Sequence, residues 1–179
     1  MPKADLNKQI EEKFRSLTSS GELFDTFQDA LKNNITDPDI YKILLANPNL
    51  TSEEIMMYTE KLAKEFRHFE YDYYMWTAQV FENNLFDLNS IENSFNYYVK
   101  ANSCKPTESE PLLRILGLYN YDLYLPLNEK IVSTVETLLS KVNLKSRVYF
   151  ALAEHFKRLG NFELEKKYLR LAEKSLKKE

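Results

Sequence analysis

The spacing of hydrophobic residues along the chain is that of amphipathic helices almost throughout. Near the N-terminus, Leu6, Ile10, Phe14 and Leu17 follow at intervals of four, four and three residues, which places them on one face of a helix. Gly21 is predicted to end this first helical region. A second apolar stripe predicts another helix after it, with Leu23, Phe24, Phe27, Ala30 and Leu31 as its members.

Local capping signals mark where the next two helices begin. Asp37 precedes Pro38, and these residues suit the N-cap and the first helical position. The short helix from Pro38 is predicted to end near Asn47, because the residue before a proline is pushed out of the α region. In "LTSEEI", Thr51 and Glu54 have the spacing of a capping box, and Leu50 and Ile55 flank it as a hydrophobic staple. The stripe that continues this helix is Ile55, Tyr58, Thr59, Leu62 and Phe66.

The stretch 68–81, "HFEYDYYMWTAQVF", is rich in aromatic residues and contains the only tryptophan. At about 100° per residue, the aromatic side chains fall on one broad arc and are interpreted as packing residues. Glu70 fits this arc poorly, so the helix is predicted to begin after it, with Asp72 as its cap. The opposite, candidate binding side holds Asp72, Met75, Gln79, Glu82 and Asn83.

The stretch 112–125, "LLRILGLYNYDLYL", contains residues compatible with a strand, but its apolar spacing fits a helix about as well. No strand is required anywhere in the chain. Only 3 of the 179 residues are glycine, which leaves few positions for the tight turns of a hairpin-rich sheet. The predicted fold class is therefore all-α.

The end of the chain carries a repeat motif. Residues 146–177 contain an aromatic residue, a Leu–Ala pair and a second aromatic residue, followed by a glycine turn and a second helix; these positions are Tyr149, Leu152, Ala153, Phe156, Gly160, Phe162, Leu169 and Ala172. This unit resembles a tetratricopeptide repeat (TPR). A small residue early in the second helix and a closing proline are missing, where Glu165 and Lys177 stand.

Two weaker copies precede this unit. Residues 71–106 repeat the pattern, with about four extra residues in the turn around 83–89, and two registers one residue apart fit 109–142. Three units are about the minimum for a stable array. The resemblance implies an α-solenoid of antiparallel helix pairs over residues 66–179. Residues 1–65 are expected to form an N-terminal helical cap in the same continuous domain of about ten helices.

In TPR arrays the first helices line a concave groove that holds a peptide or a partner helix. The resemblance therefore implies a set of partner-binding positions in each of the three units. These are Met75, Gln79, Glu82, Asp72 and Asn83; Glu110, Leu113 and Tyr121; and Arg147, Phe150, Glu154, Lys157 and Arg158.

Catalytic chemistry is sparse in the sequence. His68 and His155 are the only histidines and Cys104 is the only cysteine, which is too few for a zinc cluster. The few glycines provide no phosphate-binding loop. We therefore expect no cofactor, no metal and no enzymatic activity.

Charge is distributed unevenly. From residue 141 onward there are 11 Lys and Arg against 5 Asp and Glu, whereas the whole chain has 24 and 27. The basic end is expected to attract an acidic segment of a partner protein. Nucleic-acid binding through the C-terminal helix is a less favoured alternative, because the chain as a whole is acidic, with a pI near 5.6.

The remaining expectations concern location and assembly. The N-terminus lacks a secretory signal, and no apolar run approaches the roughly 18 residues of a membrane span, so a cytoplasmic protein is predicted. The expected function is that of an adaptor, scaffold or assembly factor. A permanent subunit of a larger complex or a homo-oligomer is the alternative. A homodimer would use the last helix, which carries two apolar stripes: Phe162, Leu169, Ala172 and Leu176, and Leu164, Tyr168 and Leu171.

Overall fold

The computed structural model describes residues 3–83 and 87–179, and the elements within these ranges are all helical. They are α1 (Lys3–Ser16), α2 (Ser20–Lys32), α3 (Pro38–Leu45), α4 (Ser52–Glu65), η1 (Arg67–Phe69), α5 (Glu70–Glu82), α6 (Leu88–Cys104), α7 (Glu110–Gly117), α8 (Pro126–Leu138), η2 (Leu139–Lys141), α9 (Lys145–Arg158) and α10 (Phe162–Leu176). The all-α prediction is confirmed. The longer turn predicted around residues 83–89 lies partly outside the described residues.

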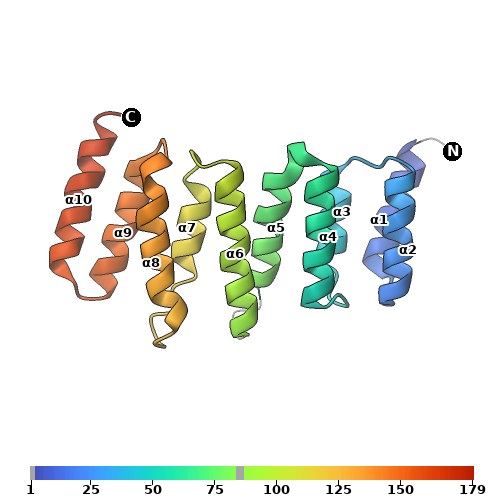
Figure 1. Cartoon of the computed structure of the whole chain (residues 1–179), viewed down its shortest axis with the longest axis horizontal. Coiled ribbons are helices and arrows are strands. Elements are labelled where there is room, and N and C mark those ends of the chain that lie inside the picture. The colour runs from blue at the N-terminus through green and yellow to red at the C-terminus, as the bar shows by residue number, and fades with distance from the viewer. Residues whose placement is uncertain (1–2, 84–86) are drawn as a thin grey trace.

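The helices stand side by side in one elongated row, with the N-terminus at one end and the C-terminus at the other (Figure 1). Most helices pack against the next one in the chain, and the pairs α5·α6 and α9·α10 have the most extensive contacts. Odd-numbered helices also contact one another, in the pairs α1·α3, α3·α5 and α7·α9. Residues 1–65 supply α1 to α4, which extend the row at one end and join the rest through α3·α5 and α4·α5.

The predicted helix starts are present with their hydrogen bonds. The Asp37 side chain accepts from the Asp39 amide at 3.0 Å, directly before Pro38 begins α3. At α4, the Thr51 hydroxyl accepts from the Glu54 amide at 3.2 Å, and the Glu54 carboxylate accepts from the Thr51 amide at 2.8 Å. This reciprocal pair is the capping box, which satisfies two backbone donors at the helix start.

Two predicted helix boundaries are wrong. Gly21 does not end a helical region, because it lies in the first turn of α2. Helix α5 begins at Glu70 rather than after it, and Asp72 lies inside its first turn. The 3-10 turn Arg67–Phe69 lies between α4 and α5 and runs directly into α5. The start of α5 therefore continues from a helical turn, and its N-cap residue Phe69 makes no side-chain cap hydrogen bond.

The stretch 112–125 is helical only in its first half. Helix α7 ends at Gly117, and residues 119–125 form no helix. The Asn120 side chain accepts from the amides of Asp122 and Leu123, both at 2.9 Å, a local turn that competes with the helix. The Asn128 side chain then donates to the Asn120 carbonyl at 2.8 Å, which fixes this segment against the start of α8.

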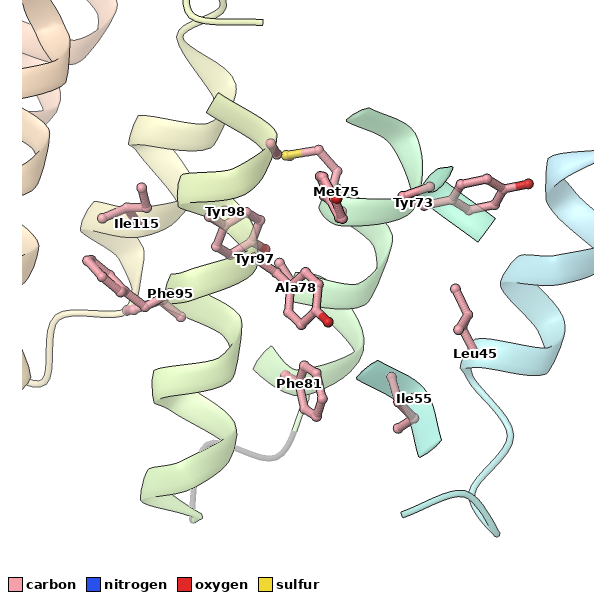
Figure 2. Close-up of a cluster of buried hydrophobic side chains, with 14 of the residues drawn as sticks. Leu45, Ile55, Tyr73, Met75, Ala78, Phe81, Phe95, Tyr97, Tyr98 and Ile115 are labelled. Atoms are coloured by element: carbon pink, nitrogen blue, oxygen red, sulfur yellow. The ribbon is translucent and has the colours of Figure 1, made fainter. Parts of the chain in front are cut away.

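The centre of the row is packed mainly by aromatic side chains. Ala78 and Phe81 of α5 lie beside Tyr97 of α6 (Figure 2), and the rings of Phe81 and Tyr97 are stacked with centroids 6.0 Å apart. One polar contact is also buried here: the hydroxyls of Thr59 and Thr77 are 2.7 Å apart. This contact links α4 to α5, since Thr59 lies on α4 and Thr77 on α5. Both side chains are fully buried, so neither hydroxyl can bond to water instead.

Candidate interaction surface

Side chains of α5, α7 and α9 form two neighbouring hollows on the surface. The first, of about 490 Å³, lies between α5 and α7 and reaches the end of α3. The second, of about 240 Å³, lies between α7 and α9. Helix α7 separates them, because Arg114 lines the first hollow and Leu113 lines the second.

Seven of the predicted partner-binding residues line these hollows. Gln79, Glu82 and Asn83 lie together in the first, beside Trp76, Val80, Ala46 and Arg114. Leu113, Tyr121, Glu154 and Arg158 lie together in the second, beside Leu116, Gly117, Ala151 and His155.

The predicted position Met75 is not on this surface. Its side chain is only 8% exposed, it does not line the first hollow, and in Figure 2 it lies toward α6. The neighbouring Trp76 packs partly against the core, as predicted, and the half-buried ring also lines the first hollow. Met75 was misassigned because α5 is apolar on most sides, so the apolar spacing does not define its outward face.

Trp76 connects α5 to α3. Its indole nitrogen donates to the Lys42 carbonyl at 2.9 Å. On its other side it lines a further surface depression with Phe14, Arg15 and Ile43. The hydrogen bond holds the indole in place while part of the ring stays accessible, as in many binding surfaces that use tryptophan.

The remaining predicted positions lie outside the two hollows. Arg147, Phe150 and Lys157 are exposed on α9, Glu110 is half-buried at the start of α7, and Asp72 is half-buried on α5. Arg114 and Trp76 line the first hollow but were not among the predicted partner-binding positions. An Arg four residues after a Glu on a predicted helix is a detectable signal for Arg114.

The basic groups of this surface are paired with carboxylates. Arg114 lies 3.0 Å from Glu110, and Arg158 lies 3.4 Å from Glu154. Arg147 reaches the same Glu110 at 3.9 Å and donates to the Ser109 hydroxyl at 3.4 Å. The hydrogen bond that Arg114 donates to Glu110 raises the pKa of Arg114. Of the basic residues expected to form the positive end, Arg147 and Arg158 are thus each close to a glutamate.

His155 forms the floor of the second hollow. It is 1% exposed, its Nδ1 lies 2.9 Å from the Tyr121 hydroxyl, and its Nε2 has no hydrogen-bond partner among the described residues. Burial, followed by the charge of Arg158, lowers the pKa of His155. The ring is therefore neutral near neutral pH, and it packs edge to face against Tyr119 at 4.4 Å.

The described residues also bear on metal ligation and on membrane spanning. In the described part of the chain, no group of three or more His, Cys, Asp or Glu residues is placed to hold a metal ion. Over the same residues, no helix is long and apolar enough to cross a membrane.

Comparison of the chain with protein-family models, with curated proteins and with solved structures finds no match.

Proposed function

We propose that the chain is a non-enzymatic protein–protein interaction module, a TPR-like α-solenoid that acts as an adaptor, scaffold or assembly factor. The alternation of chain-neighbour contacts with contacts between odd-numbered helices supports this reading. In such an array, one layer of helices presents a continuous binding face. Here that face is the one formed by α5, α7 and α9.

The observation that carries the proposal is the pair of adjacent hollows on these three helices. Their lining combines apolar surface from Trp76, Val80 and Leu113 with the side chains of Gln79 and Asn83. Amide side chains can both donate to and accept from a peptide backbone. Half-exposed aromatic and aliphatic groups provide the apolar contact that a bound segment buries. We therefore propose a peptide or helix that crosses α7 and occupies both hollows.

The proposed partner segment carries acidic side chains. Arg114 and Arg158 each line one hollow and present guanidinium groups that bind carboxylates in a forked geometry. A partner carboxylate would have to replace or share Glu110 and Glu154. The electrostatic contribution is therefore modest and depends on salt.

A display library of random peptides, selected on the purified chain, tests the proposal. The selected peptides should be enriched in acidic and apolar residues. Their affinity should fall about tenfold or more, equivalent to about 1.4 kcal/mol, in the Asn83→Ala/Arg114→Ala variant. The matched control is Asn96→Ala/Lys130→Ala on α6 and α8, where both residues are exposed. Equal affinities for the two variants would show that the hollows are not the binding site.

A permanent subunit of a larger complex is the second candidate. Large apolar side chains are exposed on α10, including Phe162 at 64% and Leu176 at 59%, and exposed apolar patches mark interaction sites. A permanent subunit would aggregate or unfold when produced alone. A well-folded, monodisperse isolated chain would exclude this candidate.

A further inference from the structure

An apolar stripe runs along the exposed side of α10. It consists of Phe162, Leu169 and Leu176, which are 64%, 36% and 59% exposed. They are spaced seven residues apart, nearly two helical turns, so they lie on one side of the helix. Helix α10 stands at the end of the row (Figure 1), and the described residues place no further helix against this side.

The stripe is separate from the packing face of α10. Tyr168 and Ala172 are buried against α9, where the rings of Tyr168 and Phe156 are stacked at 5.4 Å. Of the two apolar stripes expected from the sequence, one therefore completes the core. Most of the other is left uncovered, which is unusual for the terminal helix of a helical array.

The uncovered stripe is symmetric about Leu169. Phe162 precedes Leu169 by seven residues, and Leu176 follows it by seven. If a second α10 lies antiparallel on this side, Leu169 meets its own counterpart, and Phe162 of each copy meets Leu176 of the other. This self-complementarity is what a two-fold interface between identical chains requires.

The charges beside the stripe have the same symmetry. Lys166 and Glu173 are exposed, and they follow Phe162 and Leu169 by four residues, which places both on the same flank of the stripe. In the antiparallel arrangement, Lys166 of each copy faces Glu173 of the other. In a parallel two-fold arrangement this flank of the two copies would lie on opposite sides of the interface, so Lys166 and Glu173 would not pair.

We propose that the outer side of α10 binds a second copy of this chain, forming an antiparallel two-fold homodimer centred on Leu169. The surface is distinct from the two hollows on α5, α7 and α9. Phe162, Leu169 and Leu176 are not among the residues that line either hollow. Substitutions in the hollows, such as Asn83→Ala/Arg114→Ala, should leave the dimer unchanged.

Sedimentation equilibrium over a concentration series from about 1 μM to about 1 mM tests the assembly. The chain should shift from monomer to dimer, and Leu169→Glu should weaken self-association at least about tenfold by opposing two carboxylates at the centre. Leu176→Glu, at the edge of the interface, should act in the same direction. The matched control is Met57→Glu on α4, since Met57 is 47% exposed. It should dimerise like the unaltered chain, and circular dichroism should show equal helix content in all four proteins.

A charge exchange tests the antiparallel arrangement. Lys166→Glu and Glu173→Lys should each weaken the dimer, and the double variant should restore it, because the opposed pairs are re-formed with reversed sign. A chain that stays monomeric over the whole series would overturn the proposal, as would a dimer that Leu169→Glu does not weaken. A double variant no better than the single ones would overturn the antiparallel pairing.

Discussion

The Tyr121 hydroxyl lies 2.9 Å from Nδ1 of His155, and this hydrogen bond joins the segment after α7 to the last turn of α9. Arg158 adds a second contact, with its guanidinium 5.4 Å from the centre of the Tyr121 ring. The two contacts shape the second hollow. Nε2 of this buried imidazole has no partner in the described ranges 3–83 and 87–179, so protonation of His155 would place a charge in an environment that cannot solvate it.

Acid should therefore destabilise the fold partly through His155. Its pKa in the folded state lies below the unfolded value of about 6.5, so the unfolded chain takes up the proton first. This contribution to stability is complete above about pH 6.5 and is lost as the pH falls below it. The unfolding free energy of the unaltered chain should thus fall more steeply between about pH 7.5 and about pH 5.5 than that of His155→Gln, measured by urea denaturation. Tyr121→Phe, which keeps the imidazole, should retain the steep dependence. Parallel curves for the unaltered chain and His155→Gln would contradict this account.

The buried hydroxyl pair between α4 and α5 should show strong coupling. Thr59→Val leaves the Thr77 hydroxyl without its partner, which should cost about 1 to 3 kcal/mol of unfolding free energy. Adding Thr77→Val removes the orphaned group, so the double variant should lose less than the sum of the single losses. The control is Thr26→Val, because the Thr26 hydroxyl donates within its own helix to the Glu22 carbonyl. Additive losses in the double-mutant cycle would show that the two hydroxyls do not interact.

The capping box at α4 gives a smaller and local effect. Thr51→Ala removes the acceptor for the Glu54 amide and should lower the unfolding free energy by about 1 kcal/mol. Thr137→Ala is the control, since that exposed hydroxyl bonds only to the Ser133 carbonyl inside α8. Thermal unfolding followed by circular dichroism should separate the two variants. Equal midpoints would rule out a stabilising role for the cap.

Trp76 provides a direct optical probe of the first hollow. It is the only tryptophan and it is partly accessible there. A peptide selected on the chain should change its emission intensity or wavelength on binding, because the ring exchanges water for peptide contacts. The same titration of Leu169→Glu should give the same curve, since α10 is remote from this hollow. Unchanged emission at saturating peptide would place the peptide elsewhere.

The helices that could be predicted reliably are those with a local physical signal. Asp37 with Pro38, and Thr51 with Glu54, identify their helix starts because the same few residues make the hydrogen bonds. The end of α7 was missed although Asn120 carries a turn signal. The apolar spacing of residues 119–125 resembles that of a helix. The hydrogen bond that holds this segment in a non-helical conformation comes from Asn128, eight residues after Asn120.

The surface was harder to predict than the helices. Gln79 and Asn83 of α5, and Glu154 and Arg158 of α9, line the hollows as expected, since residues three or four apart share a helix face. Met75 is covered rather than exposed, and Trp76 lines the first hollow as well as packing against the core, because α5 is apolar on most sides and packing against α3 and α6 decides which residues are covered. No periodicity in the sequence contains that information.

The elongated row also determines how the molecule responds to force. The main contacts join helices that are at most two apart in the chain, so no long-range contact ties α1 to α10. A pull on the two ends is therefore carried in series through each helix junction, and small rotations at successive junctions add up. We therefore expect the row to stretch and bend elastically, changing its length and curvature without the unfolding of any helix.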